Sequence, residues 1–122
     1  MIHGVGTDIL SVSRMGNLPE EDAFVRKTFT EKERREIFAR REPQMGLCTR
    51  FAGKEAVFKA LRIDSDTARL NEIEILAEET GAPFVTLHGR LAERAAEMGI
   101  RTVHLSLSWE TDYALAFAVA EK

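Results

Sequence analysis

The sequence predicts a single α+β domain in which helices pack on one face of an antiparallel sheet. Helical patterns are confined to the first half of the chain and to residues 88–98. The second half otherwise holds stretches of alternating apolar and polar residues, and no strand–helix unit repeats. The 122 residues suit one hydrophobic core, so we expect one domain over residues 1–122.

Residues 2–10 are expected to form a buried strand that carries one acid, Asp8. An acid inside a strand is disfavoured unless something compensates its charge. Residues 11–18 are expected to form a short helix that exposes Arg14. A second helix is expected to start at Pro19, because proline and the acids that follow it favour a first helical turn.

Two further helices are predicted in the middle of the chain. Thr30 and Glu33 match a capping box, so a helix is expected from there to about Arg41. Pro43 opens the central helix, because proline is favoured at a first helical position. We expect this helix to end near Ile63, before a short polar stretch.

The pattern changes after the central helix. Alternation at 73–78 and the apolar run 84–87 predict a hairpin around the turn at 80–83. Residues 88–98 carry apolar side chains at helical spacing, and Gly99 ends that helix.

A second hairpin is predicted at the end of the chain. Residues 103–110 alternate strictly, residues 113–119 form the last strand, and a tight turn at Thr111 joins them. The hairpins and the first strand supply the antiparallel sheet, and the helices then cover one of its faces.

Composition places the chain among ordinary soluble globular proteins. Hydrophobic residues make up 44% and charged residues 30%, which excludes a disordered chain. The one cysteine, Cys48, allows no intrachain disulfide and agrees with a reducing compartment. We see no signal peptide and no apolar run of 18 residues, so we expect a cytoplasmic protein without a membrane partner.

Charge is distributed unevenly along the chain. Residues 26–62 hold 11 Lys/Arg and 5 Asp/Glu, a net charge of +6 in a chain whose net charge is −3. This argues for an anionic partner near the middle, which charge alone leaves open as nucleotide, nucleic acid or acidic protein. A solvated helical surface explains the charge equally well. Nucleic-acid binding is disfavoured, because no aromatic residues interleave with the basic ones and the pI is near 5.7.

The central helix carries the residues best suited to chemistry. Phe51, Glu55 and Lys59 follow at i, i+4 and i+8, so they share one face. An ordinary surface Glu–Lys pair, which stabilises a helix by about 0.2–0.5 kcal/mol, is the simpler explanation. Two separated acids, Asp8 on a strand and Glu55 on a helix, are however what a hard divalent cation with phosphate ligands needs.

Two motifs together resemble a known family. Gly4-Val5-Gly6-Thr7-Asp8 is followed by residues 51–60, Phe-Ala-Gly-Lys-Glu-Ala-Val-Phe-Lys-Ala, and this pair resembles the holo-acyl-carrier-protein synthase family of 4′-phosphopantetheinyl transferases. Gly81-Ala82-Pro83, and Ser106-Leu107-Ser108 before Tyr113-Ala114-Leu115-Ala116, also look like this family. The resemblance implies the same 4′-phosphopantetheinyl transferase-like fold and a homotrimer with active sites between subunits.

The resemblance also implies an activity. Family members move 4′-phosphopantetheine from coenzyme A to a serine of an apo acyl carrier protein and release adenosine 3′,5′-bisphosphate. Matched by motif, Asp8 and Glu55 would hold Mg²⁺, and Glu55 would also help to take the serine proton. Lys59 would neutralise charge on the transferred phosphoryl group and contact coenzyme A.

Further residues are weaker candidates for substrate contacts. The candidates for coenzyme A binding are Lys54, Arg50, Arg62, Pro83 and Ser108. Arg14 and Arg26 are candidates for the acidic helix of the carrier protein. Plain solvated surface is the alternative for Lys54 and for both of these arginines.

Two positions depart from the family pattern. Trp109 stands where family members usually have histidine, and the loop at 62–66 has no glycine where they often have a glycine-rich one. The alternative function is therefore a catalytically impaired carrier-protein-binding module of the same fold. The intact set of Asp8, Glu55 and Lys59 argues against it. The sequence leaves open whether the carrier serves fatty acid or polyketide synthesis, and whether acyl-coenzyme A donors are accepted.

Overall fold

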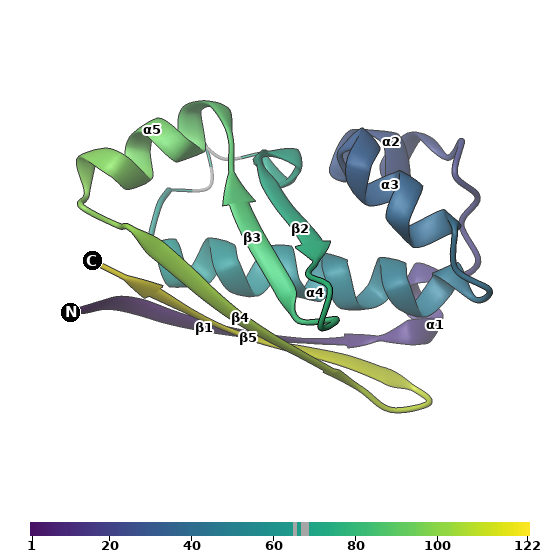
Figure 1. Ribbon diagram of the computed structural model, residues 1–122. Coiled ribbons are helices and arrows are strands. Elements are labelled where there is room, and N and C mark those ends of the chain that lie inside the picture. The colour runs from purple at the N-terminus through teal and green to yellow at the C-terminus, as the bar shows by residue number, and fades with distance from the viewer. Residues whose placement is uncertain (65, 67–68) are drawn as a thin grey trace.

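The computed structural model describes residues 1–64, 66 and 69–122, and its first layer is a three-stranded antiparallel sheet (Figure 1). The strands are β1 (Ile2–Ser11), β5 (Tyr113–Glu121) and β4 (Thr102–Trp109), and β5 lies in the middle. The longest helix, α4 (Pro43–Leu61), runs along one face of this sheet. Its start confirms the prediction at Pro43, and it ends two residues before the predicted end at Ile63.

The remaining elements lie on the same side of the sheet as α4 (Figure 1). They are the strands β2 (Ile73–Ala77) and β3 (Pro83–Leu87), the helices α1 (Val12–Met15), α2 (Ala23–Thr28), α3 (Glu31–Phe38) and α5 (Gly89–Glu97), and the 3₁₀ turn η2 (Leu70–Glu72). The predicted α+β class, with helices on one face of an antiparallel sheet, is confirmed. The hairpin β2–β3 forms a separate two-stranded sheet instead of joining the first one. Its Ile75 packs against α4 at Gly53, where Leu105 and Leu107 of β4 also meet the helix.

Small residues bring α4 very close to the sheet. On β5 the alanines face the helix and are fully buried, and Gly4 and Gly6 of β1 lie on the same inner face. A Cβ added to Gly6 would stand 2.0 Å from the carbonyl oxygen of Ala56, so only glycine permits this approach. We call this contact the small-residue seam; it consists of Gly4, Gly6, Ala114, Ala116, Ala118 and Ala120 of the sheet, against Ala52, Ala56 and Ala60 of α4.

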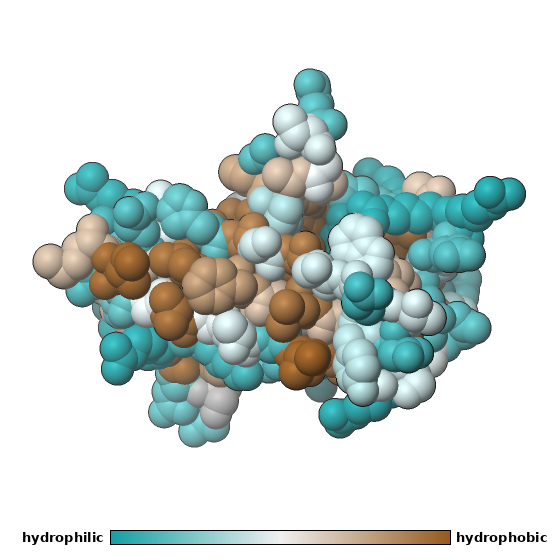
Figure 2. Space-filling view, turned by 90° about the horizontal axis from the view of Figure 1, so that it is seen from below, coloured by the Kyte–Doolittle hydropathy of each residue, from teal (hydrophilic) through white to brown (hydrophobic). Residues whose placement is uncertain are grey.

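The outer face of the sheet is apolar and exposed. Figure 2 shows hydrophobic side chains gathered on this face. The expectation that residues 2–10 form a buried strand is wrong for this face, because Val5 and Ile9 of β1 are 56% and 66% exposed. Leu115 and Phe117 of β5 are 44% and 45% exposed. None of the elements in the described ranges covers them. Alternation in the sequence identifies two faces of a strand but does not say which one is buried.

Caps fix the ends of the short helices. The capping box of α3 is confirmed: Glu33 N donates to Thr30 Oγ1 at 3.2 Å, and Thr30 N donates to Glu33 Oε1 at 2.9 Å. Helix α2 begins later than the predicted start at Pro19, because Asp22 is its N-cap and accepts from the amide of Phe24. No helix in the described part of the chain is long and apolar enough to cross a membrane.

Candidate functional site

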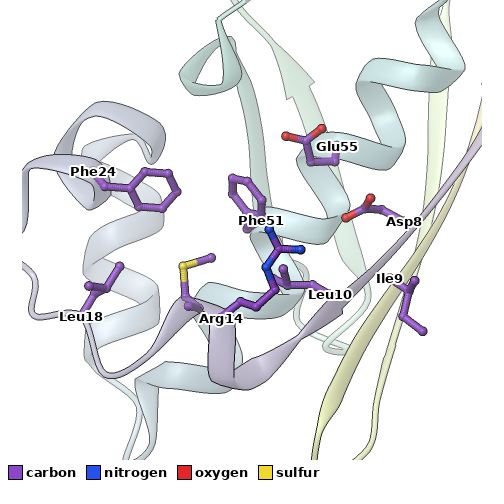
Figure 3. A pocket seen from close by; sticks show the side chains of 9 residues that line it. Asp8, Ile9, Leu10, Arg14, Leu18, Phe24, Phe51 and Glu55 are labelled. Carbon is purple, nitrogen blue, oxygen red and sulfur yellow. The ribbon is translucent and has the colours of Figure 1, made fainter.

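A cavity of about 410 Å³ opens between β1, α1, α2 and α4 (Figure 3). Its lining combines two carboxylates, one guanidinium and an apolar wall: Asp8, Ile9, Leu10, Arg14, Met15, Leu18, Phe24, Phe51 and Glu55. The sequence motifs therefore meet in space, since the strand that carries Asp8 and the helix that carries Glu55 both line one cavity.

Asp8 and Glu55 are electrostatically coupled across this cavity. Asp8 pairs with Ala116 in the sheet, so it shares the inner face with the small-residue seam. Figure 3 shows both carboxylates at the cavity. Burial raises the pKa of Glu55 above its ordinary value, and the negative charge of Asp8 raises it further, while Lys59 lowers it. Glu55 is thus a stronger proton acceptor than a carboxylate in water.

Lys59 lies beside the acid pair, one helical turn after Glu55. Its ammonium donates to the carbonyl oxygen of Thr7 at 2.9 Å and lies 3.4 Å from Asp8 Oδ1. The Lys59 side chain is 53% exposed, so the charge remains accessible to a ligand. The structure therefore brings together the three residues that the motifs singled out.

Asp8 and Glu55 are the residues of this cavity that could hold a Mg²⁺ ion, which would take its other ligands from phosphate and water. Mg²⁺ is commonly bound by one or two carboxylates together with substrate phosphates. Within the described ranges, no group of three or more His, Cys, Asp and Glu residues forms a metal site supplied by protein alone. Burial and then the charge of Asp8 raise the pKa of Glu55, and a bound cation would offset the second of these effects.

The other side of the cavity is apolar and bears one cation. Phe24 of α2 and Phe51 of α4 face each other with ring centroids 5.6 Å apart, and Met15 and Leu18 extend the wall. Arg14 reaches from α1 toward Phe51 (Figure 3). The sequence analysis pointed to Arg14 but missed this wall, in which Phe24 is 40% exposed.

The expectation that Lys54 and Arg50 contact coenzyme A is corrected by the structure. The Lys54 side chain is 0% exposed; its ammonium lies 2.7 Å from Glu33 Oε1 and donates to the carbonyl of Leu70 at 2.9 Å and to that of Ile73. Arg50 is 4% exposed and is bonded within the protein. Burial lowers the pKa of both side chains, although nearby acids raise it. Neither cation has free surface for a ligand.

The remaining predicted residues lie outside this cavity. Arg62 caps the C-terminus of α4 in the left-handed region, with φ 58°, and its stem lies against Gly4. Arg26 is exposed on α2, and Pro83 is half-buried at the start of β3. Ser108 lies on the outer face of the sheet, opposite Leu115. Of the predicted loop 62–66, Ser65 lies outside the described residues.

Trp109 lies at the end of β4 and is 61% exposed. It lines a different hollow, together with Arg41, Pro43 and Gln44 at the start of α4. Within the single chain, Trp109, which replaces the usual histidine of the family, therefore lies away from Asp8, Glu55 and Lys59.

Comparisons with known proteins identify the family of the chain. A family model described as the 4′-phosphopantetheinyl transferase superfamily matches residues 4–118. A holo-acyl-carrier-protein synthase of Desulforudis audaxviator is 42% identical over 122 residues, which cover 98% of this chain and 93% of that protein. Fatty acid synthase subunit alpha of Schizosaccharomyces pombe is 38% identical over 120 residues, which are 97% of this chain and 6% of that much longer protein.

Solved structures show the same relationship. The crystal structure of a holo-acyl-carrier-protein synthase from Neisseria meningitidis matches with a TM-score of 0.89 and 37% identity, covering 100% of both chains. A synthase from Bacillus anthracis in complex with coenzyme A (3′,5′-ADP) matches with a TM-score of 0.82 and 27% identity, covering 100% of this chain and 98% of that one.

Proposed function

Because the chain belongs to the 4′-phosphopantetheinyl transferase superfamily, we propose that it transfers 4′-phosphopantetheine from coenzyme A to a serine of an apo acyl carrier protein. The observation that carries the proposal is the shared cavity of Asp8 and Glu55, with the ammonium of Lys59 beside it. The complex of the Bacillus anthracis synthase with coenzyme A (3′,5′-ADP) supports coenzyme A as the donor. The resemblance to a fatty acid synthase subunit favours a carrier protein of fatty acid synthesis.

The chain's own residues have defined roles in this reaction. The serine oxygen forms a bond to the β-phosphorus of coenzyme A, the bond from that phosphorus to the bridging oxygen breaks, and adenosine 3′,5′-bisphosphate leaves. Glu55 accepts the serine proton, which its raised pKa favours. Lys59 offsets negative charge on the transferred phosphoryl group. Bound between Asp8 and Glu55, Mg²⁺ would withdraw charge from the pyrophosphate.

The decisive experiment is the intact mass of an apo carrier protein incubated with this protein, coenzyme A and Mg²⁺. We expect the carrier to gain one phosphopantetheine, and excess chelator to stop the gain. No gain with several apo carriers would instead favour the alternative, a carrier-binding module without catalysis. Undiminished transfer in chelator would remove Mg²⁺ from the proposal while leaving the transferase.

Arg14 and the apolar wall are proposed to bind the carrier protein. A cation beside exposed aromatic side chains suits a partner that presents an acidic and an apolar residue near its serine. We expect Arg14→Glu to raise the KM for the carrier about 10-fold or more, with little change in the KM for coenzyme A. Arg26, the other candidate for the acidic helix of the carrier, lies outside this cavity, so we expect Arg26→Glu to raise this KM less than Arg14→Glu does.

The Arg14 effect should also shrink as salt rises, because exposed charge pairs are screened. Steady-state kinetics at two ionic strengths measure both effects. Equal increases in the KM of both substrates would assign Arg14 to general site integrity rather than to carrier recognition.

We further propose a homotrimer in the cytoplasm, formed by one domain per chain. The exposed apolar outer face of the sheet supports self-association, because monomers rarely leave such a patch uncovered. Ser108, on that face, would then contact coenzyme A from a neighbouring copy. The buried unpaired Cys48 agrees with a reducing compartment.

Phe117→Arg tests this assembly, since it places a charge in the middle of the outer face while pointing away from α4. We expect the mass in solution to fall from three chains to one, with a circular dichroism spectrum like that of the parent. Light scattering coupled to size exclusion gives the mass. A parent that is already monomeric would refute the trimer.

A further inference from the structure

The strand β2 pairs with β3 along one edge only, and its other edge faces α3 and α4. On this second edge, charged side chains take the place of a neighbouring strand. Four of them bond to backbone groups: Lys54 to the Ile73 carbonyl, Arg50 to the Ile75 carbonyl at 2.9 Å, Glu33 to the Ile75 amide at 2.8 Å, and Glu36 to the Ala77 amide at 2.9 Å. We call these four residues the charged ladder.

The charged ladder is held by ion pairs between the two helices. Lys54 Nζ lies 2.7 Å from Glu33 Oε1, and both side chains are 0% exposed. Arg50 pairs with Glu36 in the same way. Within the described ranges, no buried side-chain nitrogen or oxygen lacks a hydrogen-bond partner. A fully bonded, buried pair of charges tolerates little displacement, because moving either partner leaves a charge unpaired.

The ladder residues of α4 lie next to the face of the helix that lines the cavity. Arg50 immediately precedes Phe51, and Lys54 immediately precedes Glu55. Successive residues of a helix are rotated by about 100°. The ladder residues and the cavity-lining residues therefore form neighbouring strips of one helix, and a rotation of α4 that breaks the ladder also moves Glu55 relative to Asp8.

The opposite side of α4 provides less resistance to such a rotation. There the helix rests on the small-residue seam, which consists of methyl groups and bare backbone. This seam holds α4 close to the sheet but offers few interlocking side chains, which elsewhere fix how one element is turned against another. The ladder is the buried strip of α4 on which charged side chains are held by directed bonds, whereas Lys59, which donates to the Thr7 carbonyl, is exposed.

We propose that the charged ladder sets the rotation of α4 and so holds the carboxylate of Glu55 opposite Asp8. Lys54, Glu33, Arg50 and Glu36 are then positioning residues, because they act on the reaction through Glu55 and touch no substrate. The roles of Glu55 and Asp8 rest on the proposed function. The effect on the acid pair itself does not, because it is measurable with Mg²⁺ alone.

The test uses Lys54→Met, which keeps the length of the side chain and removes its charge and donors. We expect kcat to fall about 10- to 100-fold, with each substrate's KM within about 2-fold of the parent value. Calorimetric titration with Mg²⁺ alone should show affinity about 3- to 10-fold weaker. All measurements are made well below the melting temperature of every variant.

Leu91→Ala is the matched control. Leu91 is 1% exposed on α5, and it has no part in the ladder or the cavity. Its truncation destabilises the core through a cavity. We expect parent-like kcat and Mg²⁺ affinity for this variant, which separates positioning from a general loss of stability.

Glu36→Gln keeps the test decisive if Lys54→Met does not fold. Glu36 is partly exposed, and the glutamine oxygen can still accept from the Ala77 amide while the charge opposite Arg50 is lost. We expect a smaller loss of kcat and Mg²⁺ affinity in the same direction. Parent-like values of both quantities in the folded ladder variants would overturn the proposal. A parent that transfers nothing would sink the proposed function, and the Mg²⁺ titrations would still decide this inference.

Discussion

Replacing Glu55 with glutamine is expected to slow phosphopantetheine transfer by about 100- to 10,000-fold, the range for losing a general base. The amide keeps the size of the side chain but neither accepts a proton nor offers a charged ligand to Mg²⁺. The rate and the Mg²⁺ affinity should therefore fall together. Single-turnover mass spectrometry and calorimetry measure the two losses.

The same substitution should stabilise the fold at neutral pH. The pKa of Glu55 is raised in the folded protein, chiefly by burial and then by Asp8, so the folded state binds this proton more tightly than the unfolded state. Stability is then lost as pH rises from the unfolded pKa, about 4.3, through the raised folded pKa. Glu55→Gln removes this loss, so we expect a melting temperature about 1–3 °C above the parent at pH 7.

The gain should vanish below about pH 3, where the parent carboxyl is protonated in both states. Lys59→Ala provides the contrast. It should slow transfer, because its charge is no longer available to the phosphoryl group, but it should leave Mg²⁺ affinity unchanged or slightly raised, because Asp8 loses a nearby cation. If Glu55→Gln and Lys59→Ala both turn over like the parent, this helix face is an ordinary surface pair.

The second large effect is a loss of stability, which we expect when one methyl group is added at Gly6. Gly6→Ala would place a Cβ 2.0 Å from the carbonyl oxygen of Ala56 and 2.9 Å from the amide nitrogen of Ala60, both of which are backbone atoms of α4. The helix must move away from β1, which we expect to destabilise the fold by about 3 kcal/mol or more. The melting temperature should fall by about 10 °C, and transfer should suffer as Asp8 and Glu55 separate.

Gly46→Ala is the control for this prediction. It adds the same methyl group to α4, but its nearest neighbour is Ile37 Cγ2 at 3.4 Å, an ordinary contact with a side chain. Helix propensity should then stabilise the protein by about 0.5–1 kcal/mol. Thermal melts of both variants provide the comparison. Similar melting temperatures for the two variants would show that the small-residue seam has room for a methyl group at Gly6.

Much of the fold was open to prediction because its signals are local. The capping box at Thr30 depends on two residues of one turn, and the start of α4 depends on Pro43. The acid pair was also predictable, since an acid inside a strand is disfavoured without compensation, and the two motifs that carry Asp8 and Glu55 together resemble one family. The two strands of each hairpin were found by their turns.

The features that could not be predicted depend on contacts between residues far apart in the sequence. The sequence suggested that Lys54 is exposed, because burying a lysine is costly unless an acid pairs with it. The acid that pairs with it is Glu33, which lies 21 residues away in the chain. The sequence did contain one signal for these ion pairs. Glu33 and Glu36 lie about one turn apart on one helix, and the opposite charges Arg50 and Lys54 lie about one turn apart on the next helix. The buried face of β5 was undecided for a similar reason, since its alanines face inward only because Gly6 lets α4 approach.

The charged ladder also protects the protein against self-association through backbone pairing. β2 is largely apolar, and a strand of this kind with a free edge is a template to which strands of other chains add. Here the amides of that edge are bonded by acids from α3, a helix of 8 residues that would be marginal on its own. If α3 detached first, the amides of Ile75 and Ala77 would lose these partners while β2 stayed paired with β3. Aggregation on heating or refolding should therefore follow the docking of α3 more closely than global unfolding.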